Sequence, residues 1–141
     1  MTLLCSADDQ EFRAQVESCE FPPGEFDHRA HLRLAYVYLT EYDTETAYQA
    51  MRDVLQEFLQ HNGIDISKYH ETITRAWILA VRHFMEGTVS AESADAFIQQ
   101  NTIMLDSKIM LSHYSTELLF SDEAREQFVD PDLEPIPRYD D

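Results

Sequence analysis

The sequence predicts an all-α fold, most simply a single-domain helical bundle, mainly up-and-down, over residues 1–141. Apolar residues recur at helical spacing in several segments, and no segment shows convincing alternation with a period of two. The chain has only three glycines, and each lies where a helical pattern stops or has not yet begun. With 141 residues, 44% of them hydrophobic, the chain is long enough to bury one core without disulfides or a structural metal.

The first three predicted helices follow one another through short links. The first covers about residues 8–19 and ends before the Phe21–Gly24 turn, where two prolines prevent continuation. Asp27 is a suitable N-cap for a second helix over residues 28–40. The third helix covers about residues 46–60, because its apolar residues recur with the spacing of an amphipathic helix.

The sequence of the second half of the chain predicts further helices and a tail. A fourth helix starts from a cap supplied by Asp65 or Ser67 and ends before Gly87. After it we expect a fifth helix, two shorter helices, and an extended proline-rich tail that lies on the surface. The expected ranges are 90–103 for the fifth helix, with Ser90 as its cap, 107–112 and 121–128 for the short helices, and 130–141 for the tail.

The composition restricts the classes of partner. Asp and Glu together number 27 against 10 Lys and Arg, a net charge of -17, which disfavours binding to nucleic acid and to anionic lipid. No stretch approaches the roughly 18 consecutive apolar residues of a membrane span, and the acidic N-terminal segment does not resemble a signal peptide. The sequence therefore predicts a cytoplasmic protein without membrane or nucleic-acid partners, and it is compatible with an oligomer.

Three histidines are predicted to meet at one end of the bundle. His28 and His31 lie at the start of the second helix, in the segment FDHRAHL, and His70 lies in the first turn of the fourth. Short links favour helices that alternate in direction, so the second and fourth helices begin at the same end. All three histidines belong to the apolar stripes of their helices, which predicts that they point inward. The alternative interpretation is that each imidazole only closes the core against a carbonyl or carboxylate.

Converging imidazoles suit two kinds of chemistry. As metal ligands, His28, His31 and His70 would offer three nitrogens to a divalent ion such as Fe, Zn or Cu. Without a metal they would serve directly as acid and base groups, because helix N-termini favour neutral imidazole. The further predicted site residues are Tyr69 and Glu71 as catalytic groups beside the histidines, and Arg29, Thr72, Trp77 and His113 as substrate-binding groups.

These residues support three hypotheses of function. The first is an enzyme that acts on a small molecule in a histidine-lined pocket, with or without a divalent metal. The second is a metal-free binding or regulatory module for an anionic small molecule, recognised by two helix N-termini together with Arg29, Lys68 and Tyr69. The third is an interaction protein whose acidic surface or C-terminal tail meets a basic partner.

Three segments also resemble a family of small bacterial all-helical proteins that carry FxHxxHL and YHxTIT segments. The segments are FDHRAHLRLAYVYL, KYHETIT and LSHYSTELLFSDEAREQFVDPDLEPIP, and the resemblance extends from about Phe21 to Pro137. It implies that His28, His31 and His70 form a functional set. It implies no particular activity and no cofactor.

Overall fold

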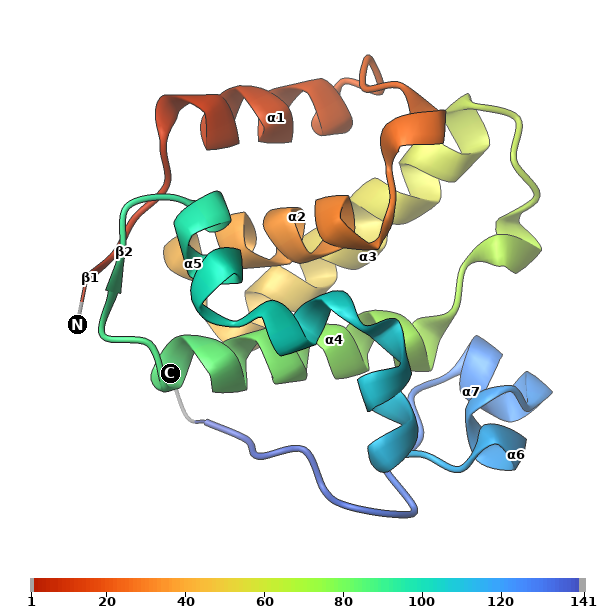
Figure 1. The fold of residues 1–141 in the computed structure, drawn as a ribbon. Helices are drawn as coiled ribbons and strands as arrows, with labels where there is room; N and C mark the ends of the chain where they lie inside the picture. Colours follow the sequence, from red (N-terminus) through yellow and green to blue (C-terminus); the bar gives the residue numbers. More distant parts are fainter. Residues whose placement is uncertain (1, 140–141) are drawn as a thin grey trace.

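Three long helices form the centre of the fold: α2 (His28–Glu41), α3 (Thr44–His61) and α4 (Glu71–Glu86). The computed structural model describes residues 2–139 and confirms the predicted all-α bundle. Helices α2 and α4 run in the same direction and α3 runs against them (Figure 1), as the short links predict. Each of the three packs against the other two. Within the described residues, no helix combines the length and the apolar character needed to cross a membrane.

Polar N-caps fix where the first helices start. Helix α1 (Ala7–Glu17) begins with a capping box, in which the Ser6 hydroxyl accepts the Asp9 amide and the Asp9 carboxylate accepts the Ser6 amide. At α3, the Asp43 carboxylate accepts the amide of Thr46 at 2.7 Å. Helix α3 therefore starts two residues earlier than predicted, because Asp43 provides a cap ahead of the first clearly periodic residues.

Helix α4 begins later than predicted. Residues Ile66–Lys68 form a single 3-10 turn, η2, that is capped by Asp65, and the chain is then extended at Tyr69. His70 is the N-cap of α4, and its Nδ1 accepts the amide of Ile73 at 3.1 Å. The prediction that His70 lies in the first turn is wrong, because Asp65 caps the short turn and a histidine takes the capping position of the helix.

The segment after α4 differs most from the prediction. Helix α5 (Ala94–Gln100) is shorter at both ends than expected, and Ser93 is its N-cap. Ser90 cannot cap it, because Ser90–Ala91 (β2) pairs in parallel with Thr2–Leu3 (β1). The other elements are the 3-10 segments η1 (Pro23–Glu25), η3 (Thr102–Leu105) and η4 (Ser107–Ser112), the helix α6 (Thr116–Leu119), which the sequence pattern did not predict, and the helix α7 (Asp122–Glu126).

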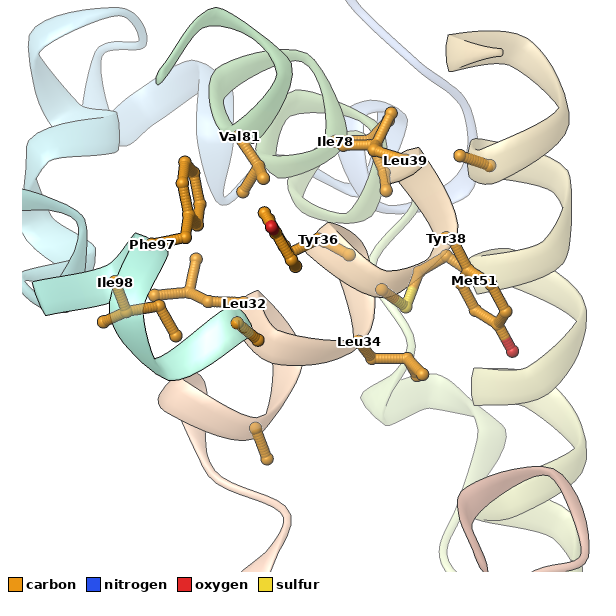
Figure 2. Close-up of a cluster of buried hydrophobic side chains, with 14 of the residues drawn as sticks. Leu32, Leu34, Tyr36, Tyr38, Leu39, Met51, Ile78, Val81, Phe97 and Ile98 are labelled. Carbon is orange, nitrogen blue, oxygen red and sulfur yellow. The ribbon is translucent and has the colours of Figure 1, made fainter. Parts of the chain in front are cut away.

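The larger apolar core surrounds α2. Tyr36 is fully buried, its ring stacks on Phe97 with centroids 4.7 Å apart, and its hydroxyl donates to the Leu4 carbonyl at 2.8 Å. Side chains from α3, α4 and α5 enclose the helix (Figure 2). The labelled residues of α2 are Leu32, Leu34, Tyr36, Tyr38 and Leu39, and those around it are Met51, Ile78, Val81, Phe97 and Ile98. Close packing on several sides holds α2, and the histidines at its start, in a fixed position.

The tail is extended, as predicted, but it does not only lie on the surface. Ile136 is buried in a second apolar cluster with residues of α4. Upstream of the tail, the buried Thr72 hydroxyl donates to the Gln127 carbonyl at 2.9 Å and accepts the Val129 amide at 3.1 Å. The segment after α7 is therefore joined to α4 by polar and apolar contacts. The last two residues of the predicted tail lie outside the described part of the chain.

Candidate functional site

A cavity of about 610 Å³ lies at the end of the bundle where α2 and α4 begin. Its walls come from the start of α2, α3 from Met51 onward, η2, the start of α4, and the segments η4 and α6. This volume is within the range of pockets that bind small organic molecules. Most of the lining side chains are apolar, and the buried ones include Leu32, Ala35, Met51, Leu55 and Ile78.

The three predicted histidines reach this one cavity from two helices. His28, His31 and His70 all line it, together with the predicted residues Tyr69 and Trp77. The parallel arrangement of α2 and α4, visible in Figure 1, accounts for this, because residues at the start of both helices line the cavity. The three imidazoles differ, however, in which ring nitrogens remain available.

His70 uses both of its ring nitrogens within the fold. Its Nε2 lies 2.7 Å from the carbonyl oxygen of Leu119, which can only accept, so Nε2 carries the proton. Its Nδ1 accepts the amide of Ile73, which requires a neutral ring. Burial lowers the pKa of His70, although the hydrogen bond to Leu119 opposes this shift. His70 therefore connects α4 to α6 and keeps no lone pair for a ligand.

His28 is half-buried and uses one ring nitrogen. Its Nε2 donates to the Met104 carbonyl at 2.8 Å. The ring stands edge-on to Trp77, with centroids 4.7 Å apart. In the neutral ring, Nδ1 is then the remaining acceptor.

His31 is the imidazole that is best placed to act on a ligand. Its Nδ1 donates to the Asp27 carbonyl at 2.9 Å, and its Nε2 has no hydrogen-bond partner within residues 2–139. The ring packs on Phe26 with centroids 4.4 Å apart. Burial lowers the pKa of His31, against the hydrogen bond to Asp27, and the neighbouring His28 lowers it further. The neutral ring is therefore oriented by the backbone and presents a free acceptor nitrogen.

The arrangement gives the predicted three-histidine metal site no direct support. No group of three or more His, Cys, Asp or Glu side chains in the described residues is placed to hold a metal ion. His70 could coordinate a metal only by giving up one of its two hydrogen bonds. The Fe, Zn or Cu site stays a prediction, while the available nitrogens suit hydrogen bonding or proton transfer.

Tyr69 and Glu71 lie two residues apart in the chain but face different surroundings. Tyr69 lines the cavity, and its hydroxyl donates to the Glu71 carboxylate at 3.0 Å. Glu71 is buried, also accepts from Tyr48, and pairs with Arg52 at 3.4 Å. It borders a separate hollow of about 300 Å³ and does not line the cavity, so its carboxylate serves the helix packing.

Three further predicted residues lie outside the cavity lining. Arg29 pairs with Asp95 on the surface, because it follows His28 by one residue and points roughly 100° away around the helix. The Thr72 hydroxyl holds the segment after α7, as described above. The His113 Nδ1 donates to the Glu134 carbonyl at 2.7 Å. The structure thus gives these side chains contacts within the protein.

Both lysines of the chain line the cavity, and the sequence singled out only one of them. Lys68 was expected near an anionic ligand, whereas Lys108 lies in η4 and had no assigned role. The only sequence feature that could have drawn attention to Lys108 was the rarity of lysine in this acidic chain. That signal could not show that the two segments meet, because the position of η4 depends on tertiary packing.

No known protein family, curated protein or solved structure matches this chain. The resemblance to small bacterial helical proteins therefore stays a prediction. The function proposed below rests on the site alone.

Proposed function

We propose that this protein binds a small, largely apolar organic molecule in the cavity, with a hydrogen bond to His31. The observation that carries the proposal is the Nε2 of His31, an oriented acceptor without a partner in the described residues. Apolar walls supply binding energy by removing ligand surface from water, at about 25 cal/mol per Å². The Nε2 acceptor selects a ligand that carries a hydroxyl or an N–H group.

An enzyme that uses His31 as a general base is the second candidate. A neutral imidazole with its Nδ1–H fixed by the Asp27 carbonyl is the form that accepts a proton at Nε2. The lowered pKa of His31 keeps the ring in this form at neutral pH. Compared with the three-histidine metal enzyme, this mechanism leaves the hydrogen bonds of His70 intact.

Trp77 makes the proposal measurable, because it is the only tryptophan of the chain and it lines the cavity. We expect octanol, which has an apolar body and one hydroxyl, to change the Trp77 fluorescence saturably. The His31→Leu variant keeps an apolar side chain but loses the acceptor, so its affinity for octanol should fall about fivefold. The matched control His83→Leu alters a histidine on α4 away from the cavity and should bind as the wild type does.

Absence of a saturable response, or equal affinities in wild type and His31→Leu, would overturn the proposal. The second candidate is tested with p-nitrophenyl octanoate, whose hydrolysis needs a base to activate water. Faster hydrolysis by the wild type than by His31→Leu supports an enzyme. Equal rates favour binding alone.

A further inference from the structure

Two lysines that form no ion pair with the described residues lie at the mouth of the cavity. Lys68 in η2 and Lys108 in η4 come from separate segments, line the same cavity, and are both exposed. Neither lysine forms an ion pair within residues 2–139. By contrast, seven of the eight arginines pair with carboxylates. An unpaired cationic side chain is therefore uncommon among the described residues, and both lysines are of this kind.

The acidic groups near the lysines are bound to backbone amides. Asp27 is the only acidic residue in the cavity lining, and its carboxylate accepts the amide of Ala30 at 2.9 Å. Asp65 and Asp106 each accept a backbone amide in their own turns, and neither lines the cavity. Hydrogen bonds from Ser67 lower the pKa of Asp65, and the charge of Lys68 adds to this shift without forming an ion pair. The lining thus has two ammonium groups against one carboxylate, on a chain whose net charge is -17. A positive mouth of this kind attracts an anion that the rest of the surface repels.

The interior of the cavity is apolar, in contrast to the charged mouth. Behind the mouth, the walls are buried side chains such as Leu55 and Ile78, and the exposed Phe120 also lines the cavity. A small polar anion could interact with the lysines but would make no apolar contacts with these walls. A neutral hydrocarbon could contact the walls but would form no ionic interaction with the lysines. A molecule with an anionic head and an apolar body matches both parts.

We propose that the cavity takes an amphiphilic anion, such as a carboxylate with an alkyl or aryl body, whose head lies between Lys68 and Lys108. This inference rests on the proposed function, because it names the chemical class of the molecule in the same cavity. The head stays near water at the mouth and the body lies among the buried walls. A hydroxyl or N–H group on the body would meet His31.

The test compares three probes that share a chain and differ in the head group: octanoate, octanamide and octylammonium. Each is titrated below its aggregation concentration while the Trp77 fluorescence is followed. We expect octanoate to bind on the order of tenfold more tightly than octanamide. We also expect it to bind more tightly than octylammonium, although the net charge of the protein favours the cation. The preference for octanoate should weaken as salt is added.

Charge variants show whether the lysines cause the preference. In Lys68→Gln/Lys108→Gln, octanoate affinity should fall to that of octanamide, while octanamide affinity stays unchanged. The control Arg29→Gln/Arg138→Gln changes the net charge equally but lies outside the cavity lining, so it should keep the preference. The variant Lys68→Arg/Lys108→Arg should keep it as well.

The outcomes separate this inference from the proposed function. Equal affinity for octanoate and octanamide in the wild type would overturn the anionic ligand and leave the binding cavity in place. A preference that survives in the lysine variant, or is lost in the arginine control, would also overturn it. Failure of all three probes to alter the Trp77 emission would count against both proposals.

Discussion

At the scale of single residues, His70 and His31 show why facing alone does not define a site. Both were predicted to point inward, and both line the cavity. Their hydrogen bonds separate them, because His70 has partners on both nitrogens and His31 has one on Nδ1 alone. Helical periodicity predicts the side of a helix on which a side chain lies, but it does not predict hydrogen-bond partners. The partner of His70, the Leu119 carbonyl, belongs to α6, a short helix that the sequence pattern did not predict.

The role of His70 as a cap predicts a large loss of stability in His70→Ala. The substitution removes the acceptor of the Ile73 amide and leaves the buried Leu119 carbonyl without its donor. We expect the free energy of unfolding to fall by about 3 kcal/mol in urea denaturation. His70→Asn restores a capping side chain and should recover about 1 kcal/mol of this. A His70→Ala protein as stable as the wild type would refute the capping role, and the exposed His61→Ala serves as the control.

At the scale of elements, prediction succeeded where local signals agree. Helices α2 and α3 combine aspartate caps with amphipathic spacing, and their bounds lie within two residues of the expected ones. Helix α5 was overestimated because the serine at residue 90 suggested a cap. That serine lies in a short strand whose partner, Thr2–Leu3, is far away in sequence. A pairing between two such short and distant segments produces no periodic pattern of apolar residues in the sequence.

The junction between α4 and the segment after α7 gives a second prediction. Thr72→Val keeps the shape of the side chain but leaves the Gln127 carbonyl and the Val129 amide without their partner. We expect a loss of about 2 kcal/mol in the free energy of unfolding. Thr74 provides the comparison, because its hydroxyl donates to the His70 carbonyl at the start of the same helix and makes no contact with the segment after α7 that matches those of Thr72. If Thr72→Val costs no more than Thr74→Val, the hydroxyl does not hold the two elements together.

At the scale of the whole molecule, the sequence predicted the class of fold and that His28, His31 and His70 lie at the same end of the bundle. It could not predict how the C-terminal third closes that end, because η4 and α6 are short and their positions depend on contacts with α4. The closure shapes the cavity. It adds Lys108 and Phe120 to the lining and places Leu119 against His70.

Global stability should depend on pH in two separate windows. The pKa values of His31 and His70 are lowered in the fold from their ordinary value of 6.5. As the pH decreases below about 6.5, these two histidines bind more protons in the unfolded chain than in the fold. The free energy of unfolding therefore falls as the pH decreases. Burial alone would raise the pKa of Asp9, but hydrogen bonds from the Ala94 and Ser6 amides and from Arg33 lower it below 3.8. The stability that ionised Asp9 contributes is therefore lost only as the pH falls below about 3.8.

Urea denaturation over a series of pH values checks this dependence. His70→Asn and His31→Leu each remove one titrating group, so each should flatten the fall that begins near 6.5. The fall below 3.8 should persist in both variants, because Asp9 is unchanged. Stability that rises as the pH drops from 7 to 5 would show that the histidines are not held neutral.

Residues near the two ends of the chain meet the same end of α4. The Thr2 amide donates to the Val89 carbonyl just beyond this helix, and Tyr139 contacts His83 in its last turn. The cavity lies around the other end of this helix, which is about 24 Å long. A protein tethered to a sensor surface through residues near either end of the chain would therefore hold the cavity on the side of α4 that is farther from the surface.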